Sequence, residues 1–479
     1  MAVLDQLKPQ KVFQLFEEMC AIPHGSRNTK AISDWCVEFA KARNLEYHQD
    51  QANNVIIIQE ASAGYENAAP IILQGHLDMV CEKEADCTKD MEKDGLDLMI
   101  DGDLVRAVGT TLGADDGIAV AMALAILDDT SLPHPRLEVL LTTDEEIGML
   151  GAADLDVTPL QGRQLLNLDC EEEGVFTVSC AGGGRACCAV SVDRAAFDGA
   201  AVKVQVSGLA GGHSGMEIDK GRGNAAILVG RLLRAMGAVT EIRLVSAGGG
   251  MKDNVIPTAA EAVVVAADAA AAKAAAEALA AAIKNEYAAT EATMEIVIAD
   301  AVADALPLDA ASTSKALCLL LCTPNGVQEM SQDIKGLVQT SLNLGILKLD
   351  ETTFSVTFCV RSAVATQKEM LFDRLHCLTE QLGGTVEITG TYPAWEYRRE
   401  SALRDRMTEV FRAQFGKEPR IEAVHGGLEC GLLCGKLPDL DCVSTGPDLA
   451  NVHTPREQMS ISSVQRMWEF VLEVLKQSK

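Results

Sequence analysis

Aromatic residues and positive charge are both scarce in this sequence. Phenylalanine, tryptophan and tyrosine make up 4% of the 479 residues, so the hydrophobic cores must be mainly aliphatic. Lysine and arginine number 41 against 69 aspartate and glutamate residues, which gives a formal net charge of −28 with neutral histidine. A surface of this sign repels polyanions, and we therefore expect no nucleic-acid partner.

The sequence also lacks a long apolar run. The longest uninterrupted stretch of apolar residues and glycine covers residues 117–127, whereas a membrane-spanning helix needs about 18 or more such residues. Near the start of the chain, Asp5, Lys8 and Lys11 interrupt the apolar run that a secretory signal would need. We expect a cytoplasmic protein with no membrane partner.

Paired zinc-knuckle cysteines are missing, although the chain contains fifteen cysteines. Cys430 and Cys434 are four residues apart, and so are Cys318 and Cys322, but no C-x2-C pair occurs. A disulfide framework is typical of short secreted chains, and this chain is neither short nor marked for export. We expect reduced, mostly buried thiols that form no metal site.

The pattern of apolar residues predicts an α/β fold in the first part of the chain. Short apolar strands at 70–74, 137–142 and 164–168 alternate with helices, one of which, at 117–128, is rich in small residues. Strands that alternate with helices in this way form a mostly parallel sheet.

The sequence pattern changes from about residue 181, where predicted strands with alternating apolar and polar residues are separated by alanine-rich segments. We expect the segment 268–283 to be a helix rather than a linker, because its charged residues are spaced as on a packed helix. After Pro393 the sequence again shows the pattern of an α/β domain. We therefore predict one domain made of residues 1–182 and 394–479, interrupted by an inserted α+β domain at 183–393.

Histidines and carboxylates gather in five short motifs, several of them directly after a predicted strand. In an α/β sheet this edge is where sites form. Each motif alone has an ordinary explanation: a hydrogen-bonded histidine, a helix N-cap or a solvated acidic turn. Together, two histidines and several carboxylates without cysteine suit zinc, cobalt or manganese, and could hold two metals. The motifs are QGHLDM at 74–79, GADDG at 113–117, TDEEIG at 143–148, NLD at 167–169 and NVHTP at 451–455.

These motifs, with others, resemble those of the dinuclear-zinc exopeptidase family that includes peptidase T, bacterial glutamate carboxypeptidase and the carnosinase-like dipeptidases. The resemblance covers essentially the whole chain, and the strings KGRGNA, HGGLECG and GPDLANVHTPRE are most similar to dipeptidases within it. The motifs that carry it are, in chain order, HLDMV, GADDG, TDEEIG, NLD, GGHSG, NVIP, VRS and GPDLANVHTP.

The resemblance implies two divalent metal ions, with Zn2+ as the first choice and Co2+ or Mn2+ as alternatives. His76 and Asp169 match the ligands of one ion, and Glu146 and His453 match those of the other. Asp115 matches the carboxylate that bridges both ions, and the family implies a cis peptide bond directly after it.

The resemblance also assigns roles to residues that hold no metal. Asp78 matches the carboxylate that orients His76, and Glu145 falls where the family has its general base. In the inserted domain, which would act as a lid over the catalytic domain, His213 matches the histidine that stabilises the oxyanion. Arg361 matches a residue that holds the terminal carboxylate of the substrate, and Asn254 lies in a matching substrate-binding loop.

The function implied is metal-dependent hydrolysis of unblocked dipeptides, including Xaa-His dipeptides such as β-Ala-His. Two metals about 3.5–4 Å apart can hold a bridging water and polarise the scissile carbonyl. Glu145 would then take the proton of that water and deliver it to the leaving amine.

Several alternatives stay open at this point. A tripeptidase or an N-acyl-amino-acid deacylase would use the same metal site, and only pocket residues would distinguish them. A metal-binding protein without catalysis would have no need of Glu145. Members of the family often dimerise through the inserted domain, so the expected partners are small peptide substrates and a second copy of the chain.

Overall fold

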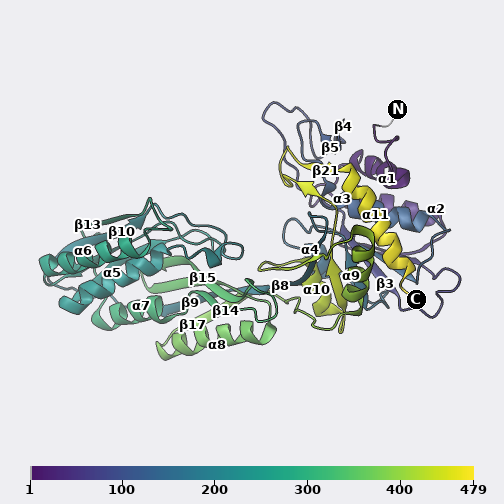
Figure 1. The fold of residues 1–479 in the computed structure, drawn as a ribbon. Helices are drawn as coiled ribbons and strands as arrows, with labels where there is room; N and C mark the ends of the chain where they lie inside the picture. Colours follow the sequence, from purple (N-terminus) through teal and green to yellow (C-terminus); the bar gives the residue numbers. More distant parts are fainter. Residues whose placement is uncertain (1–2) are drawn as a thin grey trace. The chain divides into compact units, whose positions relative to one another are not determined.

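The computed structural model describes residues 3–479. The chain forms two compact units, each with its own core (Figure 1). The first unit consists of residues 3–179, 397–423 and 428–479, and the second of residues 180–396 and 424–427. The short return of residues 424–427 to the second unit is a feature that the sequence analysis did not single out. The domain limits at residues 183 and 393 therefore stay a prediction beside these observed units.

The first unit is built on an eight-stranded mixed sheet. Its four central strands, β6, β3, β7 and β19, run parallel, and the pairs β1–β2, β2–β6 and β19–β8 are antiparallel. In spatial order the strands are β1 (Glu46–Gln49), β2 (Val55–Gln59), β6 (Leu137–Thr142), β3 (Ile71–His76), β7 (Gln164–Asn167), β19 (Asp441–Ser444), β8 (Val175–Cys180) and β18 (Arg420–Val424).

Helices and a small second sheet complete the first unit. The helices are α1 (Gln10–Cys20), α2 (Lys30–Ala42), α3 (Ala114–Asp128), α4 (Leu150–Asp154), α9 (Ala402–Phe415), α10 (Glu429–Lys436) and α11 (Ile461–Lys476). The small sheet contains β20 (Leu449–Ala450), β21 (Gln458–Ser460), β5 (Leu104–Ala107) and β4 (Leu98–Asp101).

Helix α3 is buried on nearly all sides, which explains its composition of small and aliphatic residues. From Gly117 to Leu127 every residue is buried, and the helix packs against β3 and α1. Gly117 lies against the ring of Phe16, where a Cβ atom would come within 3.3 Å. The small residues therefore allow close packing directly behind the edge where β3 ends.

The second unit is a nine-stranded sheet whose described pairs are antiparallel. Its strands are β13 (Glu295–Asp300), β10 (Ala200–Ser207), β12 (Ala260–Ala266), β11 (Ile242–Gly249), β15 (Val338–Leu349), β16 (Thr353–Ser362), β9 (Gly182–Ser191) and β17 (Thr385–Tyr392), with β14 (Gly326–Met330) paired to β15.

Helices α5 and α6 lie side by side against this second sheet (Figure 1). The expected alanine-rich helix is confirmed as α6: Asp268 caps its N-terminus, and Ala272, Ala276, Ala280 and Ile283 form its buried face. The helices of the unit are α5 (Ala225–Val239), α6 (Ala269–Glu286), α7 (Ala310–Cys322) and α8 (Ala365–Gln381). Together the two units confirm an α/β protein that carries an inserted α+β part.

Among residues 3–479, no helix combines the length and the apolar character needed to cross a membrane. All fifteen cysteines lie in this range and none of them forms a disulfide; among them, only Cys81, Cys322 and Cys377 are exposed.

Candidate dinuclear metal site

Three neighbouring strands of the first unit end at one edge of the sheet. β3 lies between β6 and β7, and all three run parallel, with His76 opposite Thr142. Side chains that follow these strands therefore come close together, as is usual at the carboxyl edge of an α/β sheet. The segments after the three strands carry, in chain order, Asp78, residues 144–146 and Asp169.

His76 is buried, with 1% of its surface exposed. Its Nδ1 lies 2.9 Å from the backbone carbonyl oxygen of Asp78, while its Nε2 lies 3.3 Å from Asp115 Oδ1 and 3.9 Å from Asp169 Oδ1. An Nδ1–H that donates to the carbonyl leaves the Nε2 lone pair free for a metal. The carboxylate of Asp78 lies farther away, at 3.6 Å from Nδ1, so the backbone of Asp78 makes the shorter contact with the ring.

Asp115 faces two histidines at once. Its Oδ1 lies 3.3 Å from Nε2 of His76, and its Oδ2 lies 3.1 Å from Nε2 of His453. Burial would raise the pKa of Asp115, but the two histidines hold it below its ordinary value. The peptide bond between Asp115 and Asp116 is cis, which confirms the expectation from the family. One oxygen facing each histidine is the arrangement that a bridging carboxylate needs.

Glu146 and His453 form a second close pair. Glu146 Oε2 lies 2.9 Å from His453 Nε2, while Glu146 Oε1 is buried and finds no hydrogen-bond partner among the described residues. Contacts with Asp115 and Glu146 raise the pKa of His453 to about 10. A buried carboxylate oxygen without a donor calls for an explanation, and a cation at this position would satisfy it.

The spacing and chemistry of these side chains fit divalent ions. Two ligand atoms that each lie about 2.0–2.1 Å from one tetrahedral zinc ion are about 3.3 Å apart. The histidine–carboxylate contacts of 2.9, 3.1 and 3.3 Å are close to this separation. His76, Asp115 and Glu146 also offer ligand atoms that all lie within 4.8 Å of one another. Imidazole nitrogens with carboxylate oxygens are the donors that zinc, cobalt and manganese accept.

Asp116 is a neighbouring carboxylate of the GADDG motif to which the sequence analysis gave no role as a ligand. His76, Asp116 and Asp169 form a second group of donors within 4.8 Å. However, Asp116 Oδ2 accepts a hydrogen bond from the backbone N–H of His76 at 3.2 Å, and it lies 2.6 Å from the position that a Cβ on Gly75 would occupy. Asp116 thus packs against the end of β3, whereas Asp115 faces both histidines.

Glu145 lies beside these donors on the loop after β6. Its backbone N–H donates to Asp78 Oδ1 at 3.0 Å. Burial, together with the charges of Glu146 and Asp115, raises the pKa of Glu145 to about 7, against a lowering effect of His76. A carboxyl group with a pKa near the working pH is suited to accept a proton and return it.

A buried polar cluster that the sequence analysis missed lies next to the strand ends. Glu429 Oε2 accepts hydrogen bonds from Gln74 Nε2 and Thr142 Oγ1, both at 2.7 Å, and Asn167 Nδ2 donates to Gln74 Oε1. Burial and the charge of Glu145 raise the pKa of Glu429 to about 8. The polar residues near the ends of apolar strands were the available signal, but Glu429 follows Gln74 by 355 residues.

The other predicted residues lie in the second unit, which is described by itself. His213 Nδ1 accepts the backbone N–H groups of Gly215 at 3.3 Å and Met216 at 3.2 Å. Burial and the charge of Arg361 lower the pKa of His213. A neutral ring that accepts at Nδ1 carries its proton on Nε2, so His213 presents Nε2–H as a donor.

Asn254 lies on a loop that backbone contacts hold in place. Its carbonyl oxygen accepts the N–H of Ser214 at 2.9 Å. On either side of it, the carbonyl oxygens of Asp253 and Val255 accept hydrogen bonds from Asn343 Nδ2 at 2.8 and 2.9 Å. The loop therefore connects Asn254 to the residue that follows His213.

Arg361 is a buried cation without an anionic partner. It is 7% exposed, its Nη1 donates to the Tyr392 hydroxyl at 3.1 Å, and its Nε has no hydrogen-bond partner. Within residues 3–479 no carboxylate lies at ion-pair distance from it. The Tyr392 hydroxyl lies over Gly183, 2.6 Å from the position of an added Cβ, so a side chain there would displace it. A buried guanidinium with a free N–H indicates a binding place for an anion.

His425, the first residue of the string HGGLECG, is another residue to which the sequence analysis gave no role. Its Nε2 lies 2.7 Å from the hydroxyl of Ser341, which is directly opposite Arg361 in the pairing of β15 with β16. Burial, followed by the charge of Arg361, lowers the pKa of His425 to about 4. The string HGG drew attention to this segment, but only the sheet register shows that His425 lies beside Arg361.

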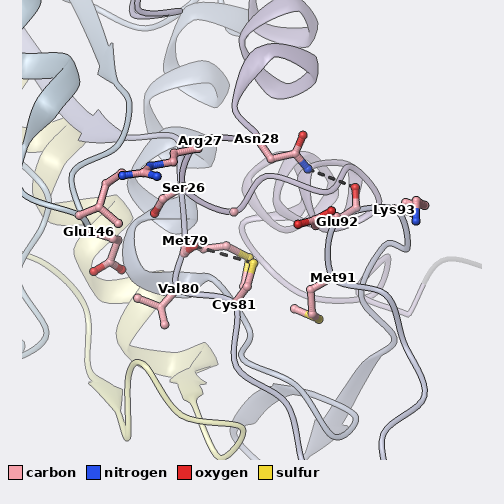
Figure 2. Close-up of a pocket in the computed structure, with 12 residues that line it drawn as sticks. Ser26, Arg27, Asn28, Met79, Val80, Cys81, Met91, Glu92, Lys93 and Glu146 are labelled. Atoms are coloured by element: carbon pink, nitrogen blue, oxygen red, sulfur yellow. Dashed lines mark hydrogen bonds between the residues drawn. The ribbon is translucent and has the colours of Figure 1, made fainter.

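A cavity of about 690 Å³ opens in the first unit beside Glu146. Figure 2 shows Glu146 on one side of it and Met91 and Lys93 on the other. Its walls include the apolar side chains of Met79 and Val80. A cavity of this volume is within the range of small-molecule sites, and it borders one of the candidate metal ligands.

Comparison with known proteins agrees with this geometry. Residues 72–477 match the family described as Peptidase family M20/M25/M40. The Cytosol non-specific dipeptidase of Escherichia coli (strain K12) is 38% identical over 481 residues, which cover 100% of this chain and 99% of that protein.

Two solved structures extend the comparison. The aminoacylhistidine dipeptidase from Vibrio alginolyticus superposes with a TM-score of 0.94 and 34% identity over 99% of this chain and 97% of that chain. The aminopeptidase PepT from Bacillus cereus ATCC 10987 gives a TM-score of 0.57 and 14% identity over 98% and 99% of the two chains, and it shares the fold alone. Because the family match covers most of the chain and the Escherichia coli relative matches it from end to end, the chain belongs to peptidase family M20/M25/M40.

Proposed function

We propose that this protein is a metal-dependent dipeptidase that hydrolyses unblocked dipeptides, including those with C-terminal histidine such as β-Ala-His. The full-length identity of 38% to a Cytosol non-specific dipeptidase carries this proposal. The TM-score of 0.94 with an aminoacylhistidine dipeptidase supports the histidine-containing substrates. The cluster of histidines and carboxylates at the sheet edge supports the dependence on metal.

The proposed ligands are His76 and Asp169 for one ion and Glu146 and His453 for the other, with Asp115 shared. We propose zinc, and cobalt or manganese would suit the same donors. When bound, two such ions supply Lewis acidity, which polarises a peptide carbonyl and makes water nucleophilic at neutral pH.

Glu145 is the proposed general base. Its pKa of about 7 and its place beside Glu146 suit a carboxylate that takes a proton from water and passes it to the leaving amine. Asp78 is a positioning residue in this scheme, because its carboxylate accepts the N–H of Glu145 and its carbonyl holds the ring of His76.

The second unit supplies the proposed substrate contacts. His213 Nε2–H is the donor that we assign to the oxyanion of the tetrahedral intermediate. The free N–H of Arg361 is assigned to the terminal carboxylate of the dipeptide. Asn254, on the loop whose backbone binds Ser214, is assigned to substrate binding. We propose that this unit acts as a lid during turnover.

A tripeptidase or an N-acyl-amino-acid deacylase is the alternative within the family. A tripeptidase from Staphylococcus aureus shares only 16% identity, so that likeness concerns the fold alone. We further propose a cytoplasmic homodimer, following the family resemblance and the cytosolic name of the Escherichia coli relative. Light scattering of the purified protein tests the dimer against a chain mass of 51.0 kDa.

A substrate panel tests the proposed function. Metal-free protein is reloaded separately with zinc, cobalt and manganese and assayed on β-Ala-His, Gly-Gly, other Xaa-His dipeptides, tripeptides and N-acetyl amino acids. We expect the highest kcat/KM on unblocked dipeptides and no turnover by the metal-free protein. Higher kcat/KM on tripeptides or N-acyl substrates would replace the proposal with the alternative.

A further inference from the structure

Glu457 places a buried carboxylate under the loop that carries Asp115. Its side chain accepts four backbone N–H groups and it is 3% exposed. Oε2 accepts from Leu112 at 2.8 Å and Gly113 at 3.0 Å, and Oε1 accepts from Ala114 at 2.8 Å and Asp115 at 3.3 Å.

Two of these N–H groups lie just before α3 and two in its first turn, and α3 has no side-chain cap of its own. The N-terminal N–H groups of a helix have no partner within the helix, and a nearby Ser, Thr, Asp or Asn usually satisfies one of them. Here Gly113 occupies the cap position with a φ of 67°, and Glu457 accepts in place of a cap. Burial raises the pKa of Glu457, and the donated N–H groups oppose only part of this rise.

Glu457 also belongs to the segment that carries His453. The two residues are four positions apart, and the backbone N–H of Glu457 donates to the carbonyl of Thr454 at 3.0 Å. The Thr454 hydroxyl in turn donates to the carbonyl of Asn451 at 2.7 Å. One carboxylate therefore joins this compact turn to the start of α3, where Asp115 lies 342 positions earlier in the chain than Glu457.

The same two segments bring Asp115 Oδ2 within 3.1 Å of His453 Nε2. We infer that Glu457 is a positioning residue that sets the distance between Asp115 and His453 before any ion binds. This inference rests on the proposed metal site, but not on the identity of the substrate. Loss of an outer carboxylate that orients metal ligands typically lowers metal affinity about 10–100-fold.

The test compares Glu457→Gln with a matched control, Glu138→Gln. Glutamine keeps the shape but presents an NH2 group to two of the four N–H donors. Glu138 is also fully buried and accepts backbone N–H groups, from Gln161 and Gly162 at 2.9 Å. It lies at the opposite end of β6 from the acidic loop, which is the segment 143–148 that carries Glu145 and Glu146. Metal-free proteins are titrated with Co2+ against a chelator, and the visible spectrum of bound cobalt is recorded together with the melting temperature of the metal-free form.

We expect both variants to melt at a lower temperature, but only Glu457→Gln to bind Co2+ about 10–100-fold more weakly, with an altered spectrum. Glu457→Asp, which keeps the charge, should recover part of the affinity and serves if the glutamine variant does not fold. Wild-type affinity and spectrum in a folded Glu457 variant would overturn the inference, and so would an equal loss in Glu138→Gln. A wild-type protein that binds two Co2+ but hydrolyses no dipeptide would overturn the proposed function alone, whereas one that binds none would overturn both.

Discussion

The carboxylate of Asp78 accepts a hydrogen bond from the backbone N–H of Glu145 at 3.0 Å. Its second oxygen accepts from the Ser26 hydroxyl at 2.8 Å and lies 3.4 Å from the backbone N of Glu146. The side chain that was expected to orient His76 therefore mainly holds the acidic loop, while its carbonyl contacts the imidazole. Asp78 thus links the positions of a proposed ligand and the proposed base.

Replacing Asp78 with Asn should lower kcat/KM about 10–100-fold. The carbonyl contact to His76 remains in this variant, but the loop loses a charged acceptor and faces an NH2 group. Steady-state kinetics and metal analysis of the purified variant measure the effect. Ser26→Ala, which removes one hydrogen bond to the same carboxylate, should cause a smaller loss. Wild-type kinetics for Asp78→Asn would show that the loop does not depend on this carboxylate.

Replacing Glu145 with Gln should reduce kcat by about 10²–10⁴, the usual contribution of a general base, and leave the metal content unchanged. The amide cannot accept a proton, and Glu145 is not among the proposed ligands. Asp144→Asn is the matched control, because Asp144 is the adjacent acid and contacts the backbone N of Arg27. We expect nearly normal turnover for the control. If Glu145→Gln remained active, the base would have to be another group.

Strand ends were the part of the site that the sequence could predict. The apolar run 137–142 coincides with β6, since a continuous buried run has few alternatives, and the helix expected at 268–283 corresponds to α6. Parallel strands bring their carboxyl ends together, so residues after β3, β6 and β7 were correctly expected to meet. The positions at which the chain passes from one unit to the other were harder to predict, because residues 424–427 return to the second unit without any marked change in composition.

The supporting residues could not be predicted, because their partners are backbone groups or distant strands. Glu457 accepts only N–H groups from residues 112–115, and no motif reports such contacts. His425 contacts Ser341, and only the strand register shows that Ser341 lies opposite Arg361. Similarly, the sequence DD does not show that Asp115 faces the histidines while Asp116 packs against β3.

Replacing Arg361 with Met should weaken recognition of the terminal carboxylate. Hydrogen bonds to charged groups contribute about 1.5–3 kcal/mol, which corresponds to a loss in kcat/KM of about 10–100-fold for a free dipeptide. The C-terminal amide of the same dipeptide has no carboxylate and should lose far less. Arg185→Met is the control, since Arg185 lies on the neighbouring strand β9 with a half-exposed side chain. Equal losses on acid and amide would contradict the assignment.

Acid should destabilise the protein partly through His425. Its pKa is about 4 in the folded protein against an ordinary 6.5, chiefly because of burial and then Arg361, with a further lowering by His213 and an opposing effect of Asp219. Between these values the unfolded chain binds more protons than the folded one, so the free energy of unfolding falls as the pH drops from 6.5 towards 4. The full contribution is at most about 3 kcal/mol.

His425→Gln keeps a polar group beside Ser341 but cannot titrate in this range. The melting temperature of the metal-free wild type should therefore exceed that of the variant most at pH 7, and the difference should shrink or reverse by pH 4.5. Taking the difference cancels the titration of groups that both proteins share. Ser341→Ala removes the hydroxyl while retaining the imidazole, so it should keep the pH dependence of the wild type. A difference that stays constant between pH 7 and 4.5 would mean that His425 is not held neutral in the folded protein.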